Sequence, residues 1–402
     1  MWKFSRNKMF YPLLKLTCRN WNFGILPLAN NICHKGSKRL MNCSSSTLKG
    51  QISKNVLSGQ LITEQNNLST SRDVLPVMLK DLSDITKRYG TPEGSKWLTT
   101  AIEYHLDKSA CNILQIATIT HEHFIKSKNI KPDNIELARI LGYCTEFLNI
   151  SVLLLDDIMD DGIYRRGHPT WYKLHGTGIA INDAFMIVHS VYLLLKHYFG
   201  HLPCYRQILE AFHENIFIAA CIQSLDMIFS KHPVDTFNMK TYKALAANKV
   251  SFDFFYLPFA TVLYLEGFSD ASILNHAQDV FIEMGIFYQI RNDYLDCFST
   301  LDSFGKIGTD IQDNKYSWLI VTAMELANEE EKQLLIECYG KKDNEKIKQV
   351  KELYTRLGLP KLYAATVEES YLKTKSLIAK ISDTTIQEIL LQISNKVYGR
   401  EN

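Results

Sequence analysis

Apolar residues recur at helical spacing along most of the chain after its first 65 residues. Alternation with a period of two, which is typical of half-buried strands, is scarce. The Lys/Glu-rich segment 328–351 is predicted to be a solvated linker between the last helices. The pattern therefore predicts one all-α domain, a helical bundle with a central cavity. The stretches with clear helical spacing are 133–155, 182–199, 205–230, 241–265, 271–298, 315–327 and 361–398.

Charge is unevenly distributed along the 402 residues, although the net charge of +2 does not suggest a nucleic-acid partner. Residues 1–63 contain ten Lys or Arg and no acidic residue, so the rest of the chain carries −8. A basic, hydroxyl-rich and acid-free N-terminus is typical of an organelle transit peptide. We predict a mitochondrial leader over residues 1–65 and a folded domain over 66–402. If the first segment is instead a disordered basic arm, a cytoplasmic protein is expected.

No membrane span is predicted, because the longest apolar run, residues 254–265, is too short to cross a bilayer and contains Pro258. The nine cysteines show no CxxC spacing. They are expected to be reduced thiols inside the fold, without an assigned role.

The segment LLLDDIMDDG over residues 153–162 ends an apolar helix in a cluster of acids. Asp156 and Asp160 are four residues apart, so they share one helix face. Their carboxylates repel each other unless a cation lies between them, and hard oxygen ligands suit Mg²⁺. A solvated surface helix end is the alternative, but acids at a helix C-terminus also face the negative end of the helix dipole. The cluster therefore predicts a magnesium site.

An arginine pair follows this cluster, and a second acidic helix end occurs later. Arg165 and Arg166 offer planar donors for phosphate oxygens, although an arginine pair alone is usually surface charge. Residues 289–296 read QIRNDYLD, so Asn292, Asp293 and Asp296 repeat the spacing of the first cluster. Two such helix ends facing each other are expected to hold Mg²⁺ around a diphosphate.

The downstream segment FGKIGTDIQDNKYSW covers residues 304–318. Lys306 and Lys315 are point charges suited to phosphate, and Asp310 and Asp313 could support metal-bound water or these lysines. A charged surface loop is the alternative interpretation.

These motifs resemble the two aspartate-rich motifs of the farnesyl diphosphate synthases. The likeness runs from about residue 85 to the end and includes QSLD at 223–226 and KVSFDFFYLP at 249–258. It implies an all-α isoprenoid synthase fold, three Mg²⁺ ions, an allylic prenyl diphosphate substrate and a homodimer. Metal ligands are implied at Asp156, Asp157, Asp160, Asn292, Asp293 and Asp296, and substrate contacts at Arg165, Arg166, Gln223, Lys249, Gln289, Lys306 and Lys315. Catalysis is expected to depend most on the first acidic cluster with Arg165, Lys249 and Lys306.

The site for a second substrate departs from the family's pattern. Family members bind isopentenyl diphosphate with a Gly-Gly-Lys-x-x-Arg segment. At the Lys and Arg positions of that segment, this chain has Ser95 and Leu98. A shift by one residue restores Lys96 but places Thr99 at the Arg position. The family's Gln seven residues before the first Asp is Asn149. We expect weaker binding of a second diphosphate, because a bidentate phosphate contact is lost.

The positions that set chain length have changed as well. Farnesyl synthases place aromatics four and five residues before the first Asp, where this chain has Val152 and Ser151. A deeper pocket is expected. Aromatic faces could stabilise a carbocation, or could simply fill the core. The nearby aromatics are Phe147, Phe254, Phe255, Phe287 and Tyr288.

Three functions remain open. The first is a terpene synthase of the kind found in insects, derived from a farnesyl diphosphate synthase, which ionises one allylic diphosphate, expected to be farnesyl diphosphate. Asn292 favours it, because class I terpene synthases also begin their second metal motif with Asn-Asp, although a tolerated substitution explains it equally well. The second is a short-chain prenyl diphosphate synthase, and the third is a non-catalytic partner subunit. The intact acidic cluster argues against the third, since a scaffold needs no metal site.

Overall fold

The computed structural model describes residues 74–89, 92–107, 109, 112–129, 134–300 and 305–399. The leader predicted over residues 1–65 lies outside these residues. All described residues belong to one compact unit, Ile52–Asn402.

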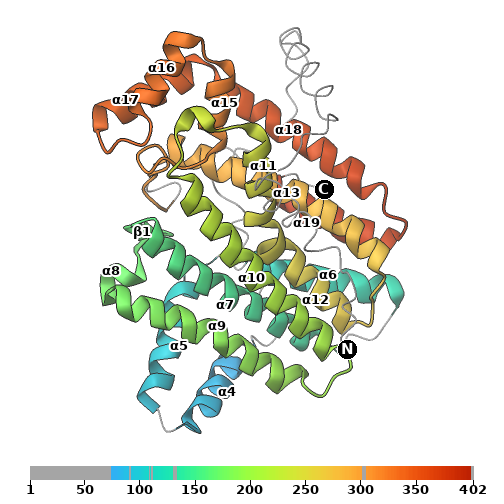
Figure 1. The fold of residues 1–402 in the computed structure, drawn as a ribbon. Helices are drawn as coiled ribbons and strands as arrows, with labels where there is room; N and C mark the ends of the chain where they lie inside the picture. Colours follow the sequence, from blue (N-terminus) through green and yellow to red (C-terminus); the bar gives the residue numbers. More distant parts are fainter. Residues whose placement is uncertain are drawn as a thin grey trace, which may run out of the picture. The chain divides into compact units, whose positions relative to one another are not determined.

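In the described part of the chain, the regular secondary structure is helical except for one hairpin of two short strands (Figure 1). The prediction of an all-α domain is confirmed. The elements are α4 (Leu75–Lys87), α5 (Pro92–Asp107), α6 (Asn112–Lys128), α7 (Ile135–Met159), β1 (Tyr164–Arg165), β2 (His168–Pro169), α8 (Trp171–His175), α9 (Thr177–Phe199), α10 (Tyr205–Phe229), η3 (Val234–Thr236), α11 (Met239–Lys249), η4 (Ser251–Tyr256), α12 (Leu257–Leu265), α13 (Ala271–Phe298), α15 (Trp318–Leu326), α16 (Glu329–Cys338), α17 (Asn344–Arg356), α18 (Leu359–Ile378) and α19 (Thr384–Val397).

Two long helices, α7 and α13, position the functional part of the fold. α7 packs against α6 and α9, while α13 packs against α18, η4 and α11. In Figure 1, α10 crosses in front of the bundle, and it contacts α9, α11 and α12. Side chains around the whole of α7 are buried, which explains why its sequence is apolar on every face. The C-terminal parts of α7 and α13 line one cavity.

The helix predicted over 241–265 is divided into three parts. α11 ends at Lys249, a π-helical segment follows as η4, and α12 begins at Leu257. Pro258 lacks the N–H that would bond the carbonyl four residues earlier, which favours a wider turn before it. Within η4, Asp253 and Phe254 line the cavity.

Segment 328–351, predicted to be a linker, instead contains α16 and part of α17. Asn328 and Glu331 form a reciprocal capping box that starts α16. Leu335, Val350 and Leu353 are fully buried. The prediction of a linker was wrong because these helices bury only a narrow stripe of apolar residues, and the charged residues on their exposed faces dominate the sequence.

Two helices, α7 and α9, are long and apolar enough to meet a length and hydropathy criterion for a membrane span. The expectation of no span considered only uninterrupted apolar runs. Buried core helices meet the same criterion, and 72% of the apolar window of α7 is buried, against 44% for α9. The difference arises because α9 presents apolar side chains outward, among them Ile181 and Phe185.

Candidate active site

The first acidic cluster lies at the end of α7, as predicted. Asp160 is the C-cap residue, and its N–H donates to the carbonyl of Asp156. Asp156 and Asp160 line the central cavity, whereas Asp157 lines a small adjoining pocket. The next acid, Asp161, is exposed and pairs with Lys173. The helix end therefore separates the acids that face the cavity from one that faces solvent.

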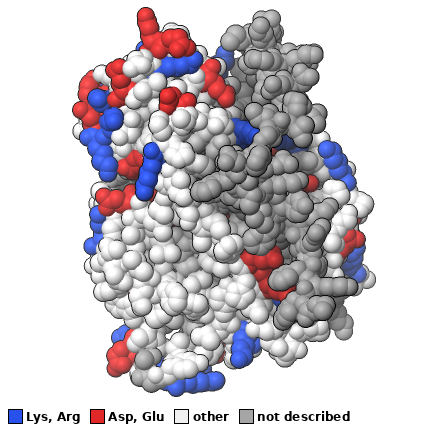
Figure 2. Space-filling model, in the orientation of Figure 1, with Lys and Arg blue, Asp and Glu red and all other residues white. Residues whose placement is uncertain are grey.

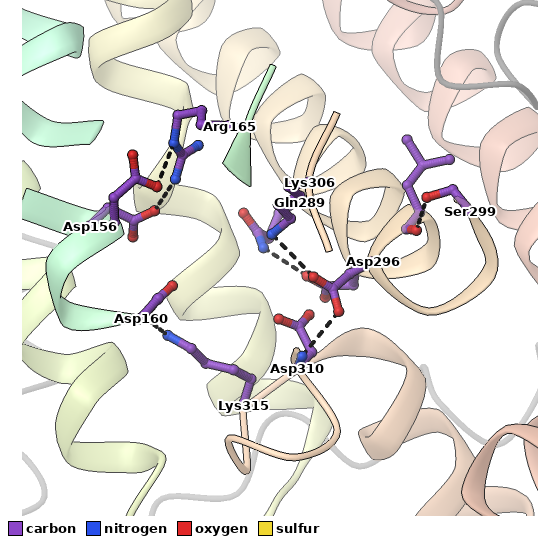
Figure 3. A network of polar contacts seen from close by, with 12 residues as sticks. Asp156, Asp160, Arg165, Gln289, Asp296, Ser299, Lys306, Asp310 and Lys315 are labelled. Atoms are coloured by element: carbon purple, nitrogen blue, oxygen red, sulfur yellow. Dashed lines mark hydrogen bonds and ion pairs between the residues drawn. The ribbon is translucent and has the colours of Figure 1, made fainter. Parts of the chain in front are cut away.

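The hairpin β1–β2 brings Arg165 back onto this cluster. Arg166 and Gly167 have φ values of 54° and 80°, as a tight two-residue hairpin turn requires. Arg165 Nη2 lies 2.9 Å from Asp156 Oδ2, and its Nε lies 2.7 Å from Asp157 Oδ1 (Figure 3). One guanidinium thus bridges two carboxylates, in the fork geometry that also suits phosphate.

Two lysines reach the same cavity from other elements. Lys315 Nζ lies 2.6 Å from Asp160 Oδ1 (Figure 3). The same Nζ lies 2.9 Å from Asp226 Oδ2. Lys249 Nζ, at the end of α11, lies 3.1 Å from the same Asp226 oxygen. Burial alone would raise the pKa of Asp226, but the two ammonium groups hold it well below its usual range. Asp226 therefore anchors both cations beside the first cluster.

The carboxylates of the first cluster oppose one another electrostatically. Burial raises the pKa of Asp157 to about 6 despite Arg165. Burial and the charge of Asp156 raise the pKa of Asp160. For Asp156, burial is outweighed by Arg165, Lys249 and Lys315, and the pKa is lowered. Three acids this close need cations, and here the chain's own side chains supply them.

The second cluster, on α13, contains one aspartate that is fully hydrogen-bonded. Asp293 Oδ2 accepts from Tyr242 Oη at 2.8 Å and from the N–H of Trp318 at 2.7 Å. Its Oδ1 accepts from Gln289 Nε2 at 2.7 Å. Asp293 thus ties α11 and α15 to α13, which is a structural role beside any metal contact.

Asp296 joins α13 to the loop that carries Lys306. Its Oδ1 accepts from the N–H of Asp310 at 3.0 Å, and Lys306 Nζ lies 3.1 Å from its Oδ2 (Figure 3). A Cβ at Gly308 would lie 1.8 Å from the Asp296 carbonyl oxygen, so this close approach requires glycine. Burial and Asp296 raise the pKa of Asp310 well above its usual range.

The cavity between the two helix ends has a volume of about 340 Å³. Asn292, from the second cluster, lines it with the acids of the first. The lining also contains eight further predicted residues: Asn149, Val152, Arg165, Arg166, Gln223, Lys249, Gln289 and Lys306. Asp293, Asp310 and Lys315 complete the predicted polar wall, and Asp226, Asp253 and Tyr316 were not predicted.

Three predicted roles have a different setting in the structure. Ser151 is 3% exposed and donates to the Leu148 carbonyl at 2.7 Å, so its hydroxyl is used within α7. Asp313 pairs with Lys342, an exposed lysine, at 3.5 Å. Phe147, Phe255 and Phe287 are fully buried in the core. Only Phe254 and Tyr288 among the predicted aromatics line the cavity.

The donor chemistry of the cavity fits a hard divalent cation. Asp156 and Asp160, from the end of α7, and Asn292, from α13, offer oxygen atoms to the same cavity, and these are the ligands that Mg²⁺ prefers. In the described residues, no group of three or more His, Cys, Asp or Glu is already gathered as a metal site. The described carboxylates instead contact Arg165, Lys315 and Lys306.

The region that corresponds to the family's binding segment for isopentenyl diphosphate is closed. Ser95 and Leu98, on α5, are each only 2% exposed. The Ser95 hydroxyl donates to Ser83 Oγ at 2.8 Å. Arg166 lines the cavity, and its Nη1 donates to the His105 carbonyl at 2.9 Å. The α5 positions therefore face the packed interior.

The bundle is built as an all-α enzyme with a central cavity between two acidic helix ends, which is the isoprenoid synthase class of fold. Farnesyl diphosphate synthase of T. brucei complexed with risedronate matches it with a TM-score of 0.76 at 24% identity, over 82% of this chain and 98% of that chain. The family model described as Polyprenyl synthetase matches residues 95–357. The chain belongs to the polyprenyl synthetase family.

Relatives support the same assignment over greater lengths. The farnesyl pyrophosphate synthase of Kluyveromyces lactis is 35% identical over 346 residues, covering 84% of this chain and 99% of the relative. That of Nezara viridula is 31% identical over 404 residues, covering 99% of both. The predicted likeness to farnesyl diphosphate synthases is confirmed, and the protein is an enzyme of the prenyltransferase type. These matches favour the condensing alternative over terpene formation.

Proposed function

We propose that this enzyme ionises an allylic prenyl diphosphate, with farnesyl diphosphate as the expected substrate. Arg165, Lys249 and Lys315 hold the diphosphate beside the first acidic cluster, and Lys306 approaches from the opposite wall. Each cation is already within 3.1 Å of a carboxylate, so little reorganisation is needed when charge develops on the leaving group. Arg166, Gln223 and Gln289 line the same cavity and orient the substrate.

The proposal includes Mg²⁺, held by Asp156, Asp157 and Asp160 on one side and by Asn292, Asp293 and Asp296 on the other. Three ions are the number that the family resemblance implies. When bound, Mg²⁺ neutralises diphosphate oxygens and so improves the leaving group. Among the ligands that line the cavity, Asp293 is expected to bind the metal least strongly, because its two oxygens already accept three hydrogen bonds.

The fate of the cation is proposed to be terpene formation from a single substrate, a hydrocarbon or an alcohol. The observation that carries this proposal is the burial of Ser95 and Leu98, at 2% exposure each, where a condensing enzyme presents Lys and Arg to a second diphosphate. Phe254 and Tyr288 line the cavity and offer aromatic faces to a carbocation.

Condensation with isopentenyl diphosphate is the second candidate. It is favoured by the similarity to farnesyl pyrophosphate synthases, and Arg166 still lines the cavity. In this case a second diphosphate would bind without the Lys and Arg that condensing enzymes have at the positions of Ser95 and Leu98.

One assay distinguishes these candidates. The purified protein is given farnesyl diphosphate and Mg²⁺, with and without isopentenyl diphosphate, and released diphosphate and organic products are measured. We expect diphosphate and a volatile sesquiterpene without the second substrate. Product formation only when isopentenyl diphosphate is added would support condensation. Inactivity both with and without isopentenyl diphosphate, with geranyl diphosphate also tested as the allylic substrate, would support the third function, a non-catalytic partner subunit.

A homodimer is proposed from the exposed surface of α9 and α10. Phe185, Phe217 and Ile228 are 64%, 54% and 52% exposed. Charged residues are scarce where these helices lie in the view of Figure 2. A second copy of this chain would cover such an apolar face, since contiguous apolar patches usually mark interaction sites. We expect a dimer by light scattering, and a monomer or a weaker dimer for Phe185→Asp.

Mitochondrial localisation is proposed from the basic, acid-free segment before Glu64. Residues 1–65 fused to a fluorescent reporter should direct it to mitochondria. A diffuse cytoplasmic signal would contradict the proposal.

A further inference from the structure

A carboxylic acid without an assigned role lies in the cavity wall. Asp253, on η4, is 8% exposed and lines the cavity together with Asn149, Gln223 and Phe254. Its Oδ1 atom is buried and has no hydrogen-bond partner among the described residues. A buried, unpartnered carboxyl oxygen is destabilising for the fold, so its presence indicates a use in function.

The electrostatic setting of Asp253 differs from that of three other cavity acids, each of which pairs with a cation. Asp156 pairs with Arg165, and Asp160 pairs with Lys315. Asp226 pairs with both Lys249 and Lys315. Within the described part of the chain, no Lys or Arg forms an ion pair with Asp253. Burial raises its pKa to about 7, although the backbone N–H groups of Phe254 and Asp253 itself act in the opposite direction. A carboxyl in this state can both accept and release a proton near neutral pH.

The backbone holds this side chain in a fixed position. Asp253 lies in the middle of the π-helical segment, a backbone form that occurs frequently at functional sites. Ser251 of the same segment packs against Gly285 of α13, where a Cβ would lie 2.0 Å from Ser251 Oγ. η4 is thus seated directly on α13, and Asp253 faces the cavity from a rigid support.

We propose that Asp253 accepts the proton whose loss ends the reaction. A C–H bond beside the cationic carbon breaks, its electron pair forms a C=C bond, and the proton passes to the Asp253 carboxylate. The resulting carboxylic acid returns the proton to water after the products leave. This inference rests on the proposed ionisation of an allylic diphosphate and adds the group that quenches the cation.

The surrounding wall fits this role. Phe254, Ala219 and Ile222 supply an apolar lining suited to the hydrocarbon chain. The diphosphate-binding cations Arg165, Lys315 and Lys249 pair with Asp156, Asp160 and Asp226, so they leave Asp253 without a competing counter-ion. The nearby Gln223 Nε2 is also buried without a partner in the described structure, and can donate to the carboxylate or to a bound product.

The test compares Asp253→Asn and Asp253→Glu with the wild-type full chain, using farnesyl diphosphate and Mg²⁺. The Asn variant keeps the size of the side chain but cannot take the proton, whereas the Glu variant keeps the carboxyl. For Asp253→Asn we expect diphosphate release within about threefold of wild type, because ionisation does not use this group. The main deprotonated product should fall at least about tenfold, with alcohols or other olefins in its place. Asp253→Glu should recover part of the wild-type product pattern.

Two results would overturn the assignment: an unchanged product pattern and rate for Asp253→Asn, or an equal loss of diphosphate release and of product in a folded variant. Circular dichroism and thermal unfolding check the fold. If Asp253→Asn is unfolded, Asp253→Ser, which also lacks the carboxyl group, takes its place with the same expected and contradicting results. The wild-type arm tests the proposed function separately. If wild type forms product only with isopentenyl diphosphate, terpene formation is wrong, and the same variants are compared in that assay. Condensation also ends in proton loss, so slower product formation by Asp253→Asn supports the assignment and unchanged turnover contradicts it.

Discussion

The two acidic helix ends look alike in sequence but are stabilised in different ways. At the end of α7, the acids contact side-chain cations, with Arg165 on Asp156 and Lys315 on Asp160. On α13, Asp293 accepts a hydrogen bond from the Trp318 backbone, as well as from two side chains. Long cationic side chains can exchange a carboxylate for a phosphate, whereas a backbone N–H cannot leave its place.

This difference assigns unequal roles to motifs of equal spacing. The first helix end is arranged to exchange partners, as a ligand site requires. The second combines a site with a structural joint between α11, α13 and α15. Removing an acid should therefore reduce activity at the first end and stability at the second.

The largest effect is expected for Asp156→Ala. The change removes a cavity carboxylate that both a metal ion and Arg165 would use, so diphosphate release should fall about a thousandfold. Thermal unfolding should change little, because the loss also relieves repulsion within the cluster. The matched control is Asp161→Ala, five positions further on, whose side chain is 76% exposed. Activity within about twofold of wild type is expected for this control, and equal losses in both variants would remove the metal assignment.

Asp293→Ala should show the opposite balance. It leaves the Tyr242 hydroxyl and the Trp318 N–H without their acceptor, which should destabilise the fold by about 3 kcal/mol. The melting temperature should fall by roughly 5 °C. Differential scanning calorimetry measures this change. A stable variant with lost activity would show that the two helix ends are equivalent after all.

Asp226→Asn tests the anchor of the two lysines through pH. The pKa of Asp226 is held below its unfolded value, so its stabilising effect is present above about pH 4 and is lost as pH falls through the lower folded value. The variant should be about 2 kcal/mol less stable than wild type at pH 7. Urea unfolding at pH 7 and pH 3 should show this difference shrinking at the lower pH, and a gap that grows on acidification would contradict the pairing.

The smallest effect is expected for Lys315→Met. Lys249 and Arg165 remain beside the first cluster, so kcat/KM should fall only about tenfold. The effect should appear mainly in KM, because the ammonium group binds the diphosphate before and during ionisation. Lys342→Met is the control, since Lys342 is 71% exposed and pairs with Asp313 at the surface. Steady-state kinetics on both variants check the prediction.

The helical class and the first cluster could be predicted because their signals are local. Asp156 and Asp160 share one helix face by their spacing alone, and Arg165 follows within ten positions of Asp156, so a short turn is enough to bring it back. The hydrogen bond from Tyr242 to Asp293 joins residues 51 positions apart, and no local sequence pattern predicts a contact over that distance. Burial of Ser95 also depends on packing against Ser83, a tertiary contact. Asp253 did leave a signal, as a lone acid within the apolar run that precedes Pro258.

The turn that carries the arginine pair has a mechanical consequence. The N–H of Gly167 donates to the carbonyl of Gly305 at 2.8 Å, and a Cβ on Gly305 would lie 2.9 Å from the Arg166 Cα. The backbones that present Arg165 and Lys306 are therefore in direct contact. Displacing either segment would disturb the other, so Arg165 and Lys306 are expected to change position together rather than independently.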